Sequence, residues 1–238
     1  MANHVLLDSR THAELRIRTD RGAELGDGIM SCLAVPAEFR SLQNEYPILF
    51  RLSLERDSYG AVALLGFETG ENLYLQDGRW DARYVPLALD IQPFLIGMAE
   101  PEAETKQVHV DMDSARVAAS EGVRVFDEHG RATPYLEEIA EKLGALDEGY
   151  QASDDFHAAL RRYELLEPMT FEVTLDDGST NRLVGFHVID EDRLRALDPV
   201  AVAELHSGGH LLPIFMAMAS LANLGGLVAR KNRQHPDG

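Results

Sequence analysis

The sequence is poor in cysteine, and this limits the chemistry that the chain can support. Cys32 is the only cysteine among 238 residues. The chain therefore has no internal disulfide and no cysteine-based zinc site. Because the residues flanking Cys32 are apolar, we expect a buried side chain rather than a reactive thiol.

Basic residues are also scarce. The sequence has 22 lysines and arginines against 40 acidic residues, a formal net charge of −18. Such a surface repels phosphate backbones and anionic lipid headgroups. We therefore expect no nucleic-acid partner, whereas basic or neutral partners remain compatible with the charge.

The N-terminal region lacks the pattern of a secretory signal. Asp8 and Arg10 interrupt the apolar residues before a long hydrophobic run can form. Without a signal or disulfides, we expect a cytoplasmic protein. Association with the cell surface stays open and would need another export route.

The familiar sequence motifs of catalysis are missing as well. The chain contains no glycine-rich phosphate loop, no nucleophile elbow and no HExxH metal motif. Their absence removes the common nucleotide-binding, hydrolase and metalloprotease templates. An unfamiliar active site is not excluded by this argument.

One long uncharged stretch occurs, at residues 211–229, close to the minimum length that spans a bilayer. Pro213 and the pair Gly225 and Gly226 interrupt it, and its many alanines favour insertion only weakly. We expect a core or interface helix, through which two copies of the chain could associate. Membrane association is the less favoured alternative.

Apolar runs of strand length and turn residues dominate the first half of the sequence. Residues 48–54 and 61–67 flank a glycine-containing loop and predict a hairpin. Pro36 favours a helix over 37–45. Further strands are predicted at 73–76, 94–98 and 108–112.

Helix signals are concentrated in the second half. Thr133 is a good N-cap for a helix that we expect to end at Gly144, and Ser153 is predicted to open a second helix. The strongest hairpin signal, with Asp177 and Gly178 at its turn, covers 169–190. Asp190 is then expected to cap a short helix.

These patterns predict an α+β fold, with a mainly antiparallel sheet of short strands and helices concentrated in the C-terminal half. We expect a single domain over residues 1–238. If the chain is subdivided, the segment 99–107 is the expected place.

A metal site is one hypothesis from the residues. In "QVHVDMD", strand alternation places His109 and Asp111 on one face, and His187 could supply a third ligand. Two histidines and a carboxylate form the facial triad of nonhaem Fe(II) oxygenases. A polar strand face without a metal is the simpler interpretation, and we assign no cofactor otherwise.

Aromatic residues in a loop provide the other candidate site. The predicted set is Asn72, Tyr74, Arg79, Trp80 and Tyr84, which lie among glycine, aspartate and arginine residues. Amphipathic aromatics in such a loop can recognise a protein or peptide partner. Alternatively, Trp80 caps the hydrophobic core.

The order of several segments resembles that of the bacterial SapC family. The resemblance runs from about Val35 to the terminal helix and is carried by "VPAEFRSLQNEYPILF", "ALLGFETGENLYLQDGRWDARYVP", "QPFLIG", "VRVFDEHGRATPYL", "GFHVIDEDRLRALD" and "LPIFMAMASLANLGGL". The sequence departs from the family at "ALDIQPF", where many relatives carry paired arginines before the proline.

The resemblance implies an accessory or binding protein linked to surface-layer or TonB-dependent uptake systems. It implies no catalytic residues. The aromatic loop is then the expected recognition surface. A structural surface-layer component and the Fe(II) oxygenase described above are the two alternatives.

Overall fold

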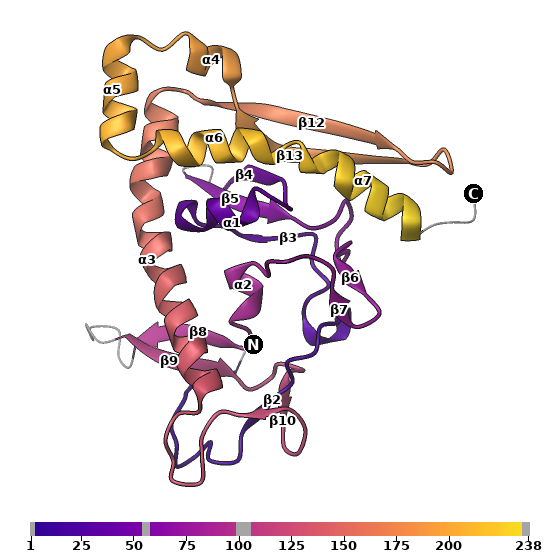
Figure 1. Cartoon of the computed structure of the whole chain (residues 1–238), viewed down its shortest axis with the longest axis vertical. Helices are drawn as coiled ribbons and strands as arrows, with labels where there is room; N and C mark the ends of the chain where they lie inside the picture. The colour runs from indigo at the N-terminus through magenta and orange to yellow at the C-terminus, as the bar shows by residue number, and fades with distance from the viewer. Residues whose placement is uncertain (1–2, 54–57, 99–105, 235–238) are drawn as a thin grey trace.

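Short antiparallel strands and C-terminal helices form an α+β fold, as the sequence predicts (Figure 1). The computed structural model describes residues 3–53, 58–98 and 106–234. Cys32 is buried, as expected from its apolar neighbours.

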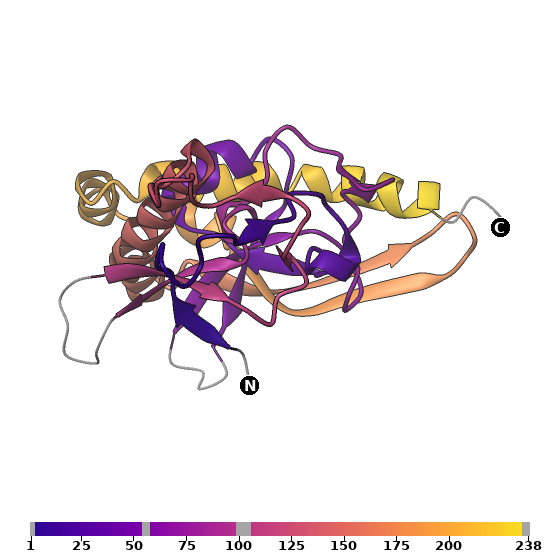
Figure 2. The ribbon, with the colours of Figure 1, turned by 90° about the horizontal axis from the view of Figure 1, so that it is seen from below.

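The largest sheet has five strands in the order β12-β13-β4-β5-β3, and all neighbours are antiparallel. They are β3 (Ser31–Leu33), β4 (Ile48–Leu52), β5 (Tyr59–Leu64), β12 (Leu166–Thr174) and β13 (Thr180–Ile189). Both predicted hairpins are confirmed. Gly178 adopts a φ of 81° in the β12–β13 turn, a conformation that favours glycine. This hairpin forms a long arm (Figure 2).

Three smaller antiparallel sheets are found among the described residues. The first contains β1 (His4–Leu6), β9 (Lys106–Asp111) and β8 (Phe94–Met98). The second contains β10 (Val117–Ala118), β2 (Arg16–Ile17) and β11 (Val123–Arg124). The third contains β6 (Leu75–Gln76) and β7 (Arg79–Trp80). The strand prediction at 94–98 is therefore confirmed, and its partner begins two residues earlier than expected.

Helix α3 (Pro134–Arg162) is one continuous helix of 29 residues, so the prediction of two helices was wrong. Thr133 caps it as expected by accepting a hydrogen bond from the Leu136 N–H. Ser153 caps nothing, because its hydroxyl donates to the Gly149 carbonyl oxygen at 2.7 Å, one turn earlier. A Cβ on Gly149 would lie 2.8 Å from Val35 Cγ2, so glycine permits close packing there.

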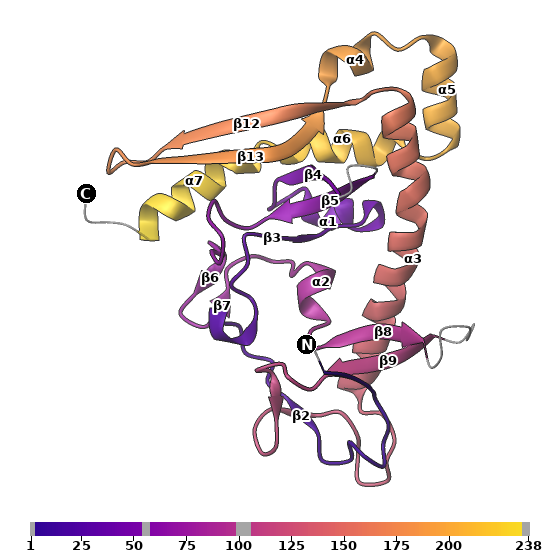
Figure 3. The same ribbon diagram turned by 180° about the vertical axis from the view of Figure 1, so that it is seen from behind.

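Two hydrophobic clusters form the core, and α3 contributes to both (Figure 3). The upper core lies around the five-stranded sheet and includes Phe50 and Phe156. The lower core lies around the smaller sheets and includes Val110 and Leu136. The expected subdivision near 99–107 falls mostly on residues 99–105, which lie outside the described residues.

The remaining short helices include η1 (Ala23–Leu25), η2 (Pro36–Glu38), α1 (Phe39–Leu42), α2 (Leu87–Asp90), α4 (Glu191–Arg195) and α5 (Pro199–Ser207). The helix expected over 37–45 is thus replaced by η2 followed by α1. Asp190 caps α4 as predicted, accepting a hydrogen bond from the Arg193 N–H at 2.8 Å.

The uncharged C-terminal stretch forms two helices, α6 (Leu211–Ser220) and α7 (Asn223–Gln234). Asn223 donates to the Gln43 carbonyl oxygen at 2.8 Å, and Ser220 accepts from the Ile48 N–H at 2.8 Å. These bonds attach the break between α6 and α7 to the end of α1 and to the first residue of β4. By length and mean hydropathy, 1.8, the segment Leu211–Gln234 could cross a membrane, and 39% of its most apolar window is buried in the fold. One segment of this kind is weak evidence for a membrane span.

Candidate functional site

The predicted aromatic site turns inward. Asn72 and Tyr74, which we expected on a recognition surface, are buried, so their side chains are not exposed to a partner in this fold. The Asn72 side chain donates to the Asp27 carbonyl oxygen at 2.8 Å and accepts from the Tyr74 N–H at 3.0 Å. Tyr74 donates its hydroxyl to the Glu45 carbonyl oxygen at 2.6 Å. These groups hold the segment against the upper core.

Trp80 packs against the upper core, which agrees with its interpretation as a core-capping residue. Its indole N–H donates to the Tyr46 hydroxyl at 2.8 Å, and its ring stacks on Tyr74 with an interplanar angle of 14°. Tyr84 donates its hydroxyl to Glu38 Oε1 at 2.8 Å. Arg79 is exposed. The polar tips of the aromatic set are thus used inside the fold.

The three predicted metal ligands do not come together. His109 and Asp111 lie on β9 in a small sheet, whereas His187 lies on β13 in the five-stranded sheet. His187 packs edge-on against the ring of Tyr59 at 5.1 Å between centroids. Within residues 3–53, 58–98 and 106–234, no group of three or more His, Cys, Asp or Glu side chains could hold a metal. The predicted Fe(II) triad was therefore wrong.

A different polar cluster lies where the upper and lower cores meet. We call it the junction cluster: Arg21, Asp27, Asp90, Arg116 and Lys142. Asp90 ends α2 between Leu89, which belongs to the upper core, and Ile91, which belongs to the lower core. The other four residues come from the segments around η1, from the β9–β10 loop and from α3.

Asp27 and Arg116 form the centre of the junction cluster. Arg116 Nη2 lies 2.6 Å from Asp27 Oδ1, and the two side chains are 2% and 0% exposed. Arg116 Nη1 also donates to the carbonyl oxygens of Arg18 and Asp20, at 3.1 and 2.8 Å. Asp27 Oδ2 accepts from the Gly22 N–H at 2.9 Å. Losing either charge would leave the other buried without compensation.

Arg21, Asp90 and Lys142 extend the cluster toward solvent. Arg21 bridges Asp27 and Asp90, and Lys142 Nζ lies 2.6 Å from Asp90 Oδ2. Burial would lower the pKa of Lys142, but the hydrogen bonds that Lys142 donates to Asp90 and Glu138 raise it above its ordinary value. Lys142 therefore keeps its charge at neutral pH.

A cavity of about 180 Å³ opens beside this cluster, and we call it the junction pocket. It is lined by Arg18, Thr19, Arg21, Asp90, Gln92, Arg116, Tyr135, Glu138, Ile139 and Lys142. Arg116 Nε is buried and has no hydrogen-bond partner in the part of the chain that the structure describes. Burial raises the pKa of Tyr135 to about 12, so its hydroxyl remains a donor.

Sequence reasoning missed every residue of the junction cluster. Asp27 and Arg116 are 89 positions apart, and no spacing rule joins them. The nearest local signal is an arginine in "DMDSARVAAS", a segment without other basic residues. Only the fold brings the cluster together.

Comparison with known proteins gives one match. The family model described as SapC matches residues 7–227, which is most of the chain. No curated protein and no solved structure matches.

Proposed function

We propose that this chain, which belongs to the SapC family, is an accessory or binding protein that holds a small oxyanion in the junction pocket. The ligand class is a phosphate or a small carboxylate. The observation that carries the proposal is the pocket itself, with its positively charged wall and the buried, incompletely paired Arg116. No catalytic step is assigned.

The charges on the pocket wall support an anionic ligand. Four lining residues are cationic (Arg18, Arg21, Arg116 and Lys142) and two are acidic (Asp90 and Glu138). Two carboxylates outside the wall offset this excess: Asp27 pairs with Arg21 and Arg116, and Asp20 lies 3.8 Å from Arg18. A wall with more cations than carboxylates is notable in a chain whose net charge is −18, because it concentrates positive potential at one place.

The donors on this wall suit an oxyanion. Arginine pairs with carboxylates and phosphates through several N–H groups, and a Tyr135 hydroxyl that stays protonated adds a neutral donor. The volume of about 180 Å³ admits a phosphate or a short carboxylic acid and is too small for a nucleotide.

Calorimetric titration tests the proposal, with inorganic phosphate and succinate as probes at fixed ionic strength. We expect saturable binding to the wild type and roughly tenfold weaker binding to Arg18→Gln, because one charge-assisted contact is lost. Arg10→Gln is the matched control: it removes an exposed arginine outside the pocket. Equal affinities for the two variants would contradict the proposal.

The proposed biological setting rests on what the family resemblance implies. We place the protein with surface-layer or TonB-dependent uptake systems, in which a bound anion or a protein partner would be its cargo or signal. The expected location is the cytoplasm, with surface association as the alternative. An Fe(II) oxygenase is no longer supported, because its ligands lie apart.

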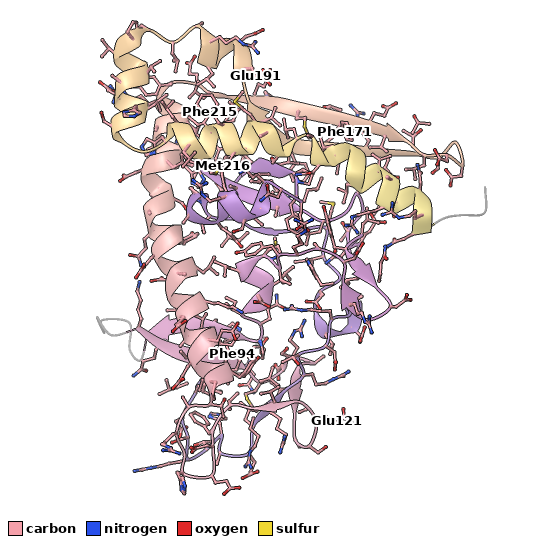
Figure 4. The ribbon with its side chains drawn as sticks, in the orientation of Figure 1. Phe94, Glu121, Phe171, Glu191, Phe215 and Met216 are labelled. Carbon is pink, nitrogen blue, oxygen red and sulfur yellow. The ribbon has the colours of Figure 1, made fainter. Side chains whose placement is uncertain are left out.

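Self-association through the C-terminal helices is a second candidate function, and it would also suit a structural layer component. Phe215 and Leu212 are each 52% exposed on α6, whereas Met216 is buried (Figure 4). The exposed positions of this face continue through Ala219 and Ala222 without a charge. The face is therefore the place where two strongly acidic chains can meet with least repulsion.

Light scattering of the purified protein tests this candidate. We expect a dimer that becomes a monomer in Phe215→Ser, while Val184→Ser, which alters an exposed valine on β13, leaves the mass unchanged. A monomeric wild type would contradict self-association. Co-sedimentation of the wild type with phosphatidylcholine vesicles would instead assign the face to a membrane.

A further inference from the structure

A second cavity lies between the C-terminal half of α3 and the strands β4 and β5. We call it the α3 groove. Its volume is about 580 Å³, and its wall includes Arg51, Tyr59, Val62, Tyr150, Asp154 and His157. It shares no lining residue with the junction pocket. The α3 groove therefore requires its own explanation.

His157 is the unusual residue of this groove. Its side chain is only 9% exposed, and Nε2 is buried without a hydrogen-bond partner. The ring is held between aromatic neighbours, with its centroid 6.5 Å from that of Phe50 and 5.7 Å from that of Phe156. Burial lowers the pKa of His157, so the ring is neutral near pH 7. A neutral imidazole can present a lone pair to an N–H donor.

A carboxylate lies one helical turn before this imidazole. Asp154 precedes His157 by three positions, so both side chains lie on the same side of α3. Asp154 acts electrostatically on His157, yet it forms no ion pair with any described residue. The groove wall thus carries a carboxylate without an ion-pair partner among the described residues, and the imidazole beside it keeps a buried nitrogen that is also unpaired within them.

Two tyrosines complete the wall. Tyr59 is held in place by the edge-on ring of His187 at 5.1 Å. Tyr150, on α3, is 59% exposed and lies at the rim. Aromatic faces beside a carboxylate attract ammonium groups, because the ring quadrupole adds to the charge of the carboxylate.

We propose that the α3 groove binds a cationic amine, with Asp154 pairing with the ammonium group, His157 accepting an N–H bond and the tyrosines covering the carbon chain. The amine could belong to a free polyamine or to a lysine side chain of another protein. An acidic chain of net charge −18 favours such a ligand over long range.

Among the described residues that line the groove, Arg51 is the cation that opposes this assignment. Its guanidinium lies 5.4 Å from the ring centroid of Phe186, on the neighbouring strand β13. The charges that act on His157 are those of Asp154 and Arg161, and Arg161 is exposed outside the groove. The end of the groove near His157 therefore keeps its acidic character.

The test uses the full-length protein, with putrescine and a capped Ala-Lys-Ala peptide as probes. Binding is followed by calorimetry and by the NMR signals of the His157 ring. We expect saturable binding of at least one amine with a shift of the His157 signals. Asp154→Asn should weaken binding roughly tenfold. Asp155→Asn is the matched control, because it removes the same charge from the next residue, which does not line the groove.

Each outcome decides the proposal. Binding of the peptide alone assigns the amine to a protein side chain, and binding of putrescine alone assigns it to a free polyamine. Equal losses in Asp154→Asn and Asp155→Asn would overturn the site, since they would indicate nonspecific attraction. Absence of any His157 shift at saturation would overturn it as well. His157→Phe, which removes both ring nitrogens, should also weaken binding. If that variant does not fold, His157→Gln, which keeps a polar side chain, is used in its place and should weaken binding as well.

Discussion

The aromatic segment and the junction pocket are two polar regions of similar complexity that differ in how completely their hydrogen bonds are satisfied. Around Trp80, the indole N–H and the hydroxyls of Tyr74 and Tyr84 all donate to groups of the same chain. At the junction, Arg116 keeps a nitrogen without a partner, and charged side chains border a cavity.

This difference separates a structural role from a binding role. A network whose donors are all used inside the fold gains nothing from an anionic ligand, because the ligand would have to replace existing bonds. A network with unused donors on a cavity wall can gain from one. Residue types alone suggested the aromatic segment as the binding site, whereas the hydrogen-bond partners favour the junction pocket.

The largest expected effect is the loss of stability when the centre of the junction cluster is broken. Arg116→Met leaves Asp27 buried without its main partner and should lower the free energy of unfolding by about 3–5 kcal/mol. Urea denaturation measures the change. Adding Asp27→Asn to that variant should recover part of the loss, because no unpaired charge then remains. A single-variant loss below about 1 kcal/mol would contradict the buried pair.

Exchange of a pocket lysine should affect binding more than folding. Lys142→Met removes a cation from the pocket wall and should weaken phosphate binding about tenfold. Lys106→Met is the matched control, because Lys106 also pairs with an aspartate, Asp147, but lies away from the pocket. If the two variants bind phosphate equally, the pocket does not hold the anion.

The aromatic segment should show the reverse behaviour. Tyr74→Phe removes the hydroxyl that donates to the Glu45 carbonyl oxygen, and should cost about 1 kcal/mol of stability. Phosphate affinity should stay within about twofold of the wild type. Thermal unfolding measures the stability, and calorimetry on the same sample measures the phosphate affinity. A large loss of affinity would contradict our assignment of a purely structural role to the aromatic segment.

An effect as small as that of Tyr74→Phe is expected at a buried carboxyl beside the aromatic segment. Burial raises the pKa of Glu38, although hydrogen bonds from the Leu87 N–H and the Tyr84 hydroxyl oppose the shift. A carboxyl with a raised pKa favours folding only while it is protonated, so stability is lost as the pH rises through that pKa. Glu38 Oε2 is also buried without a partner.

Glu38→Gln should therefore be more stable than the wild type at pH 8, by about 1 kcal/mol. The amide oxygen can still accept the bonds that reach Oε1. The advantage should disappear near pH 4, where the wild-type carboxyl is protonated in both states. Urea denaturation at the two pH values checks this, and a variant that is less stable at pH 8 would show that the carboxylate is needed.

Local signals predicted much of the fold. The Asp177-Gly178 turn and the alternating residues around it specify the β12–β13 hairpin, and Thr133 with Pro134 specifies the start of α3. The end of α3 was not predictable from composition. Gly144 weakens a helix by only about 1 kcal/mol, and packing against both cores outweighs that cost.

The candidate sites were much less predictable. The sequence around Tyr74 and Trp80 would look the same whether their side chains faced a partner or the core. Only their burial in the structure distinguishes these two arrangements. His109 and His187 satisfy a ligand pattern in sequence but belong to different sheets. The Asp27–Arg116 pair depends on two loops meeting, which no local pattern encodes.

A crystal structure of the protein with selenate tests the central claim most directly, because this phosphate-like dianion can be located by the anomalous signal of selenium. We predict a selenium peak inside the junction pocket, with selenate oxygens within hydrogen-bonding distance of Arg18 and Lys142. The peak should be lost in the Arg18→Gln variant. An empty junction pocket in wild-type crystals, with selenate ordered elsewhere on the protein, would contradict the account.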